Sequence, residues 1–229
     1  MRQPFEQSHP IPGAVSGAIP EERMAFIRKV YAAFMGSILM LAVGVAGVLT
    51  VPGVGQAVAD SFWVVIVAEF AALAGVIFLR KRAGLRLLLF GAFSLITGLT
   101  TGLLVAQYVA QGMGDVVLQA AGLTVVAFGG LTTYAFTSGK DFSFLRGFVT
   151  TGLFVVVGGS ILTWFIDAPA LSFAVAGGGV LLFSGFILYD TSNIIRRYRE
   201  DEWLSAAMGL YLDVLNLFLF LLRLLARRD

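Results

Sequence analysis

The chain has 229 residues, of which 58% are hydrophobic and only 13% are charged, with a formal net charge of +2. Soluble domains carry about 25% charged residues, so the composition excludes an ordinary soluble protein and predicts an all-α integral membrane protein. The chain has no cysteine, and its single histidine, His9, precedes the first apolar segment. Disulfides, thiolate metal sites, cysteine nucleophiles and a histidine-based site inside the membrane are therefore excluded.

Residues 1–23 contain four of the six prolines and no apolar run. We interpret this segment as a flexible polar tail rather than a signal peptide, because the first apolar segment begins too late and runs too long. The sequence therefore predicts two parts, the tail over residues 1–23 and a transmembrane domain over residues 24–229.

Seven apolar segments follow the tail, each close to the roughly 20 residues that a helix needs to cross the hydrocarbon. They cover residues 30–51, 61–79, 87–110, 116–136, 143–166, 170–195 and 203–225. The sequence thus predicts seven transmembrane helices. Small residues let helix backbones approach closely in lipid, so the glycines inside the segments predict packing faces. They include Gly98 and Gly102, Gly129 and Gly130, and Gly158 and Gly159.

The basic residues alternate between the connections. Lys and Arg precede the first segment and occur in the second, fourth and sixth turns, whereas the first, third and fifth turns contain none. Because basic loops remain in the cytoplasm, we expect a cytoplasmic N-terminus. Arg223, Arg227 and Arg228 conflict with this rule if the last segment crosses completely. That segment either crosses against the rule or is re-entrant, and its apolar length favours a complete seventh span.

Three carboxyl groups lie inside the predicted spans. Glu69 lies near the midplane, whereas Asp190 and Asp213 lie about 9 Å and about 16 Å along their helices from the charged turn Arg196–Glu202. An ionised aspartate at the bilayer centre costs roughly 2.5–3.5 kcal/mol on insertion scales. Such groups face the interior of the bundle and find partners there, so these three acids are candidate functional residues.

The two aspartates share a local pattern, because Asn193 follows Asp190 and Asn216 follows Asp213 after three residues, on the same helix face. Two antiparallel helices joined by a short turn can bring the carboxyl groups together, where they titrate as a unit and can share a proton. Once both are ionised they repel, and either the helices separate or a cation enters. Carboxylate and amide oxygens suit hard cations such as Ca²⁺, so the residues predict a proton-responsive cation site.

Simpler interpretations of the two aspartates remain open at this point. Asp190 can be a carboxylate at the membrane edge that pairs with Arg196 or Arg197. Asp213 can form a structural hydrogen bond between two helices. The charged turn Arg196–Glu202 is itself expected to be solvated and internally paired.

The other polar residues have simple interpretations too. A place on an ion pathway and a buried hydrogen bond account equally well for Glu69. Arg80 stands in a basic cluster and is typical of an anchor at the membrane edge. Asn193 and Asn216 are typical of polar groups that stabilise helix packing.

Two segments resemble the closing motifs of the Bax inhibitor-1 family, also called the transmembrane Bax-inhibitor-motif family. They are Phe186-Ile-Leu-Tyr-Asp190 and Gly209-Leu-Tyr-Leu-Asp213-Val-Leu-Asn216-Leu-Phe. Further similarity lies in Glu69 with Arg80 eleven residues later, in Thr97-Gly98-Leu-Thr and in Lys140-Asp-Phe-Ser-Phe-Leu145. The resemblance covers nearly all of residues 25–225 and leaves out the tail.

The resemblance implies a seven-helix fold in which the last helix is central and surrounded by the other six. It also implies a pH-sensitive calcium leak across the membrane. In the family, the carboxylates that match Asp190 and Asp213 form a hydrogen-bonded pair that senses pH, and the arginine that matches Arg80 latches it. We therefore expect Asp190 and Asp213 to form the gate and to act as Ca²⁺ ligands, Arg80 to be the latch, and Glu69 to belong to the ion pathway.

The supporting polar groups of this expected site are Asn193 and Asn216. Its partners are the lipid bilayer, Ca²⁺ as the transported ion and H⁺ as the signal, with no resident cofactor and no nucleic acid. The short C-terminal end resembles bacterial members more than the eukaryotic members that suppress cell death. We therefore expect a bacterial inner (plasma) membrane rather than a role in apoptosis.

Two other functions compete with the leak channel. A non-conducting regulator would bind another membrane protein, such as a quality-control protease, through the proline-rich tail. A proton-coupled transporter is less favoured, because the sequence shows no clear inverted repeat. An enzyme is not expected, because no nucleophile motif is present.

Overall fold

The computed structural model describes residues 15–17, 19–79 and 83–226. Every secondary-structure element within these residues is a helix. The α-helices are α1 (Pro20–Thr50), α2 (Val54–Asp60), α3 (Phe62–Phe78), α4 (Ala83–Ala110), α5 (Gly114–Thr137), α6 (Leu145–Leu162), α7 (Pro169–Arg196) and α8 (Trp203–Leu225). Three short 3-10 helices are η1 (Val15–Gly17), η2 (Phe142–Phe144) and η3 (Glu200–Glu202).

Six of these helices, α1 and α4 to α8, are each long and apolar enough to cross a membrane. The remaining predicted span, residues 61–79, corresponds to α3, which passes the same test only together with α2, and the two helices are bent by 85° where they meet. Pro52 separates α1 from α2, and Gly53 adopts a left-handed conformation with φ of 83° that only glycine takes up easily. The structure confirms an all-α membrane protein, with the second span as a bent pair.

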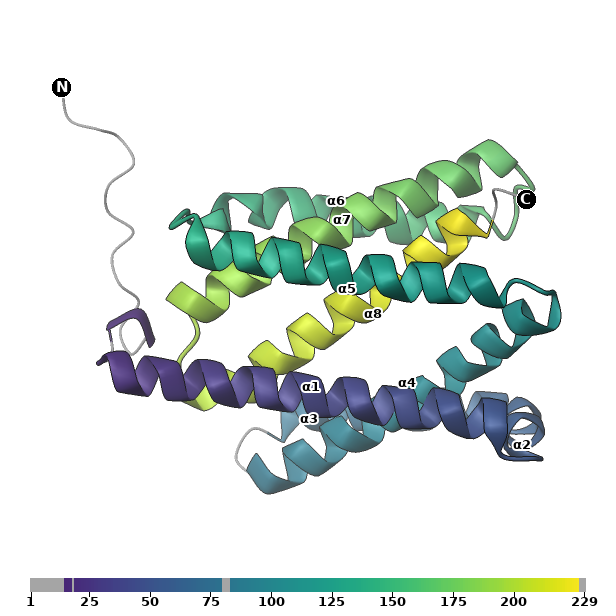
Figure 1. Ribbon diagram of the computed structural model, residues 1–229, viewed down its shortest axis with the longest axis horizontal. Helices are drawn as coiled ribbons and strands as arrows, with labels where there is room; N and C mark the ends of the chain where they lie inside the picture. Colours follow the sequence, from purple (N-terminus) through teal and green to yellow (C-terminus); the bar gives the residue numbers. More distant parts are fainter. Residues whose placement is uncertain (1–14, 18, 80–82, 227–229) are drawn as a thin grey trace.

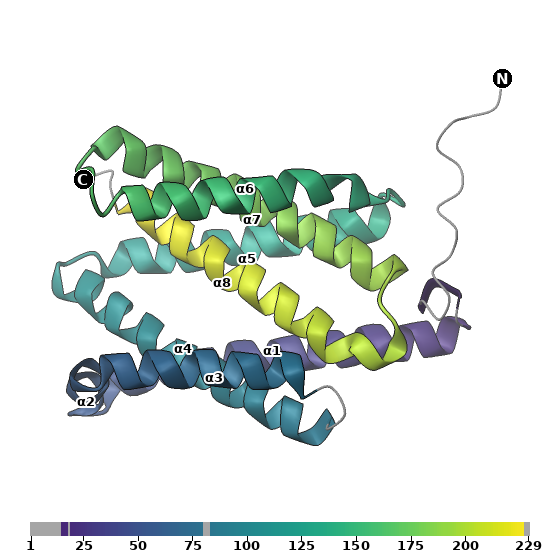
Figure 2. The same cartoon turned by 180° about the vertical axis from the view of Figure 1, so that it is seen from behind.

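The last helix lies in the centre of the bundle. α8 runs obliquely between one group formed by α1 to α4 and another formed by α5 to α7 (Figures 1 and 2). It packs against α1, α5 and α7 and also contacts α4, whereas α3 packs mainly on α4 and α6 mainly on α7. Side chains of α8 belong to both hydrophobic cores of the protein. The central position expected for the last helix is therefore confirmed.

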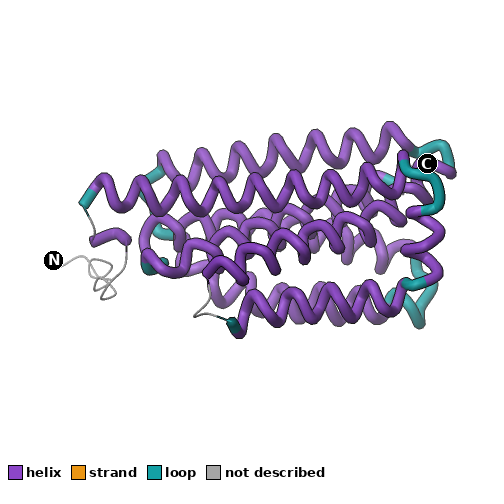
Figure 3. Tube along the Cα trace, turned by 90° about the horizontal axis from the view of Figure 1, so that it is seen from below, coloured by secondary structure: helices purple, strands orange, loops and turns teal. Residues whose placement is uncertain are grey.

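The helix ends gather at two ends of the bundle (Figure 3). α1 begins at one end, which also holds the α5–α6 and α7–α8 connections and which we call the basic end (Figure 1). α8 runs from the basic end to the opposite end, where α1 ends (Figure 1). The last segment is therefore a complete span with Arg223 in its final turn, not a re-entrant loop. Arg227 and Arg228 lie outside the described residues.

The packed part of the chain begins before the predicted boundary at residue 24. α1 starts at Pro20, and the side chain of Val15 is fully buried. The backbone N–H of Val15 donates to the carbonyl of Tyr198, 3.0 Å away, in the α7–α8 connection. Residues 1–14 and 18 of the predicted tail lie outside the described residues.

Glycines allow α1 and α4 to cross with their backbones in contact. A Cβ atom added to Gly44 would lie 2.7 Å from the carbonyl carbon of Gly98, and one added to Gly98 would overlap the backbone of Leu41. The predicted packing role of Gly98 is thus confirmed. The same prediction is wrong for Gly129 and Gly130, because no other group lies within 4 Å of a Cβ at either position.

Replacing Gly98 by alanine should force α1 and α4 apart. Overpacking of this kind costs about 1–3 kcal/mol, so we expect G98A to lower the melting temperature of the protein in detergent. G91A is the matched control on the same helix, because nothing lies within 4 Å of a Cβ at Gly91. Equal melting temperatures for the two variants would contradict the assignment of this crossing.

Candidate functional site

The antiparallel helices α7 and α8 bring the two predicted aspartates together. Asp190 lies near the end of α7, and Asp213 lies in the middle of α8. The helices approach closely because α8 has a glycine at this point. A Cβ atom at Gly209 would lie 2.6 Å from Oδ2 of Asp190, so only glycine leaves space for that carboxyl group.

The carboxyl groups of Asp190 and Asp213 lie beside each other, within reach of a hydrogen bond when one of them carries a proton. Asp213 is only 5% exposed, and its Oδ2 atom receives no hydrogen bond from an N–H or hydroxyl group of the described residues. A buried carboxylate oxygen without a donor is costly, whereas a carboxylic acid can donate its own proton to a neighbouring carboxylate. The geometry therefore suits an Asp213 O–H group that donates to the carboxylate of Asp190.

The two predicted asparagines act within their own helices. The Asn193 side chain hydrogen-bonds to Asp190, one turn before it on α7. The amide nitrogen of Asn216 donates to the carbonyl of Leu212 at 2.7 Å. Neither of these bonds joins two helices. The Asn193 side chain orients the Asp190 carboxyl group, whereas the Asn216 side chain is held within α8, one turn after Asp213.

The interpretation of Asp190 as an edge carboxylate paired with arginine is wrong. Arg196 donates to the carbonyl of Gly139, and Arg197 pairs with Asp141 at 3.3 Å. Within the described part of the chain, neither guanidinium makes an ion pair with Asp190. The charged turn was predicted to pair internally. Among the described residues, Arg199 forms an ion pair with Asp201, and its backbone N–H donates to the Glu202 carboxylate.

A cavity of about 490 Å³ lies beside the aspartate pair, between α6, α7 and α8. Its polar lining residues include Ser160, Asp190, Asp213 and Asn216, and most of the remaining lining is apolar. The described residues contain no cluster of three acidic or histidine side chains suited to a resident metal ion. The cavity thus presents two carboxyl groups and one amide to a space large enough for a hydrated ion.

Glu69 belongs to a different polar group. Thr97 and Thr100 on α4 donate to its two carboxylate oxygens at 3.1 and 3.3 Å. The buried hydroxyl of Tyr211 on α8 lies beside the hydroxyls of Ser94 and Thr97. The interpretation of Glu69 as a hydrogen-bonded acid is confirmed, and its role in an ion pathway stays a prediction.

The two groups lie on opposite faces of α8. Tyr211 packs edge-on against Phe90 and Phe93 of α4, with ring centroids 5.7 and 5.8 Å apart. Asp213 follows two residues later, about 200° around the helix, and faces α7. The structure therefore joins Asp190 to Asp213 and does not bring Glu69 to them.

Arg80, the predicted latch, lies outside the described residues. Arg86 lies in the first turn of α4, and its side chain is only 6% exposed. Its Nε donates to the carbonyl of Val76 on α3 at 2.9 Å, and its Nη2 donates to Ser205 on α8 at 3.0 Å. Arg86 therefore fixes the first turn of α8 to α3 and α4.

The sequence pattern assigned Arg86 to the basic residues of the second turn and did not predict that its side chain is buried. A signal was present, because Arg86 stands at helical spacing from Phe90, Ser94, Thr97 and Thr101. All five side chains are buried on one face of α4. An arginine in register with a buried face predicts a hydrogen-bonded interior position rather than a surface anchor.

The α5–α6 connection is tied to the end of α7, close to Asp190. Asp141 accepts a hydrogen bond from the backbone of Ser143 at 2.9 Å and pairs with Arg197 at 3.3 Å. The backbone N–H of Phe142 donates to Ser192 at 3.1 Å. Burial acts to raise the pKa of the Asp141 carboxyl, but the bonds from Ser143 and the charge of Arg197 outweigh it, so the pKa lies below its ordinary value.

The chain matches a known protein family. The family model described as "Inhibitor of apoptosis-promoting Bax1" matches residues 23–229. The chain belongs to the Bax inhibitor family. This confirms the resemblance drawn from the paired aspartate motifs.

Relatives of this Bax inhibitor family member occur in bacteria and plants. An uncharacterized protein of Helicobacter pylori is 33% identical over 205 residues, which cover 89% of this chain and 87% of that protein. The BI1-like protein of Arabidopsis thaliana is 35% identical over 214 residues, which cover 90% and 82%. The "Modulator of FtsH protease YccA" of Escherichia coli is 36% identical over 140 residues, which cover 60% and 64%.

Replacing Asp141 by asparagine tests the connection at the basic end. Because the pKa of Asp141 is lower in the folded than in the unfolded protein, its stabilisation is present above the unfolded pKa and is lost as the pH falls through the folded pKa. D141N should lower the melting temperature at pH 7 by roughly 2–4 °C, equivalent to about 1 kcal/mol. The melting temperatures of the wild type and D141N should converge as the pH falls below about 4.

The control for this comparison is D201N, because Asp201 forms an ion pair that is largely exposed. We expect D201N to melt within about 1 °C of the wild type, since exposed pairs contribute little. A loss in D141N that persists unchanged at low pH would show that the carboxylate charge is not its cause.

Proposed function

We propose that this Bax inhibitor family member is a pH-sensitive calcium leak channel whose gate is the Asp190–Asp213 pair. The observation that carries this proposal is the direct contact of two carboxyl groups across α7 and α8, next to a cavity lined by the same groups. Cation passage, selectivity for Ca²⁺ and gating by protons are parts of the proposal. The contact supports them because its strength depends on how many protons the pair holds.

With one shared proton, the pair forms a hydrogen bond that ties α7 to α8. Loss of that proton leaves two negative charges in contact, in surroundings where their repulsion is weakly screened. Either α7 moves away from α8 or a cation enters between the carboxylates. The number of bound protons thus sets both the separation of the helices and the affinity of the site for a cation.

Ca²⁺ fits the oxygen ligands that the cavity offers. It accepts carboxylate, amide and carbonyl oxygens together with water, in flexible geometry. Two carboxylates and the Asn216 amide are too few ligands to hold Ca²⁺ permanently, and weak binding is what conduction requires. The ion would pass Asp190 and Asp213 with part of its water retained.

Arg80 and Glu69 complete the proposal in the roles that the family resemblance implies. Arg80 would latch the closed pair. Glu69 would act on the ion pathway on the other face of α8, where Thr97 and Thr100 hold its carboxylate. We place the N-terminus and the basic end in the cytoplasm of a bacterium.

The decisive measurement is Ca²⁺ flux in proteoliposomes from about pH 5 to about pH 8. Wild-type flux should change several-fold as the pair loses its shared proton. D190N and D213N keep a hydrogen-bonding group but no shared acidic proton, so their flux should be nearly independent of pH. E69Q should lower the flux without removing its pH dependence.

D167N is the matched control, because Asp167 is an exposed acid in the α6–α7 connection. It should behave as the wild type does. If D190N and D213N follow the wild-type pH profile, the aspartate pair is not the gate. If flux is absent from all of these proteins, the channel proposal itself fails.

A second function, restraint of another membrane protein, is supported by the similarity to the modulator of FtsH protease. The predicted contact is the proline-rich tail, most of which lies outside the described residues. Deleting residues 2–12 removes three of its prolines and leaves Val15, which packs in the core. We expect the deletion to abolish co-purification with a membrane protease while flux remains intact. Retained co-purification would contradict a role of the tail.

A further inference from the structure

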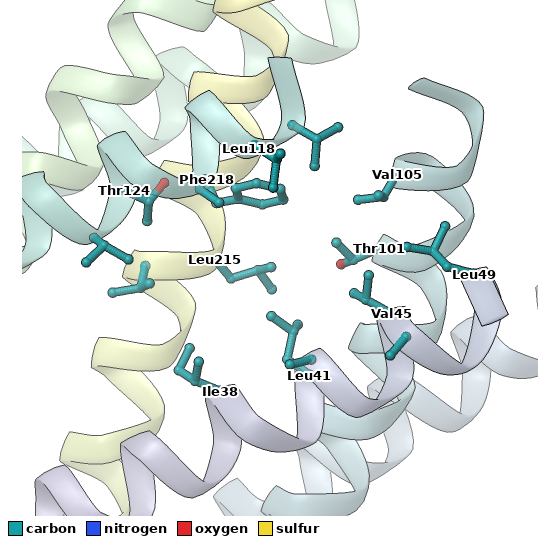
Figure 4. Close-up of a pocket in the computed structure, with 16 residues that line it drawn as sticks. Ile38, Leu41, Val45, Leu49, Thr101, Val105, Leu118, Thr124, Leu215 and Phe218 are labelled. Atoms are coloured by element: carbon teal, nitrogen blue, oxygen red, sulfur yellow. The ribbon is translucent and has the colours of Figure 1, made fainter. Parts of the chain in front are cut away.

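A second cavity, of about 420 Å³, lies between α1 and α5 and reaches the central helix α8. Figure 4 shows Leu41 and Val45 of α1 and Leu118 of α5 around a common space, bordered by Leu215 and Phe218 of α8. None of the residues that line it belongs to the aspartate pair or to the Glu69 group. The cavity is therefore separate from the proposed gate.

Aromatic rings join α1 and α5 on one side of the cavity. Towards the basic end, Tyr31 packs on Phe136 and Phe34 packs on Phe128, with ring centroids 6.1 and 5.0 Å apart. Beyond these rings both helices present small and aliphatic side chains. Those that line the cavity include Ala42, Ala46 and Ala121. These side chains are too short to fill the space that the aromatic rings hold open.

The walls of the cavity favour an apolar occupant. Thr101 and Thr124 carry the only polar side chains among the 16 lining residues, and no lining residue is charged. The hydroxyl of Thr124 already donates to the carbonyl of Ala120 at 2.7 Å. Water needs two to four polar partners to occupy a buried site, and this cavity does not provide them.

The cavity opens onto the lipid-facing surface. Leu118 and Val125 line it and are 74% and 70% exposed, and Leu49 lines it from the end of α1 with 45% exposed. These residues belong to membrane-spanning helices, so the exposed apolar surface around the opening faces hydrocarbon. A single acyl chain matches such a site, because it is wholly apolar and is already present in the hydrocarbon that the opening faces.

We propose that the cavity binds one acyl chain of a membrane phospholipid, which enters between α1 and α5 and reaches Leu215 and Phe218. The chain replaces a void with van der Waals contacts along four helices. It also contacts α8 one or two residues from Asp213, on a different face of the helix. This inference stands on the cavity alone and does not require the protein to be a channel.

Fluorescence quenching in liposomes tests the position of the acyl chain. F218W places an indole at the α8 side of the cavity, and its signal is measured as the difference from the parent protein. Phospholipids brominated on the acyl chain should quench this added signal. A121F, which fills the cavity from α5, should reduce the quenching several-fold when combined with F218W. V126F is the matched control, because Val126 is exposed on α5 and does not line the cavity.

A second readout is the lipid that remains bound after extraction in mild detergent. Native mass spectrometry should show one phospholipid on the wild type and on V126F, and none on A121F. A46F fills the cavity from α1 and replaces A121F if that variant does not fold. Equal lipid binding by the filled variants and V126F would overturn the proposal. Quenching of F218W by a water-soluble quencher would also overturn it, because the cavity would then be aqueous.

Discussion

The contact between Asp190 and Asp213 depends on Gly209, and the rest of the site depends on that contact. A methyl group at Gly209 would lie 2.6 Å from Oδ2 of Asp190, so the Asp190 carboxyl group would have to leave its present position beside Asp213. Hydrocarbon offers no water to a polar group that loses its partner. In the proposed function the two acids share a proton, which couples the number of bound protons to the contact between α7 and α8.

Three separate environments surround α8, because it lies in the centre of the bundle. One face carries Asp213 towards α7 and the cavity beside it. Another carries Tyr211 towards α4 and the hydroxyls beside Glu69. A third carries Leu215 and Phe218 towards the apolar cavity between α1 and α5. A displacement of α8 would change the contacts in all three environments. This helix could therefore couple them to one another.

The basic end holds α8 and its neighbours in place. Arg86 joins the start of α8 to α3 and α4, and Asp141 with Arg197 joins the α5–α6 connection to the end of α7. Val15 adds a backbone bond to Tyr198 in the connection between α7 and α8. These hydrogen bonds and the Asp141–Arg197 ion pair would oppose a movement of α7 against α8 at this end. The architecture is that of a Bax inhibitor family member.

The sequence by itself determined the spans, because a run of roughly 20 apolar residues has no other stable arrangement in a bilayer than a helix. It also predicted that Asp190 and Asp213 can meet, because a short turn joins two antiparallel helices, but it left simpler roles for both residues open. The bend of 85° between α2 and α3 and the burial of Val15 were not predicted, since both arise from packing rather than from composition.

Only the tertiary structure decided which polar residues share a face. Glu69, Asp190 and Asp213 were all predicted to lie inside the membrane, yet α8 stands between Glu69 and the aspartate pair, because Tyr211 and Asp213 point to different sides of it. The roles of the arginines were also decided by packing. Arg86 is buried and hydrogen-bonded because α3, α4 and α8 converge on it. Hydrophobic periodicity gives the depth and the face of a residue within its own helix, but contact between helices depends on crossings that glycines such as Gly44, Gly98 and Gly209 permit.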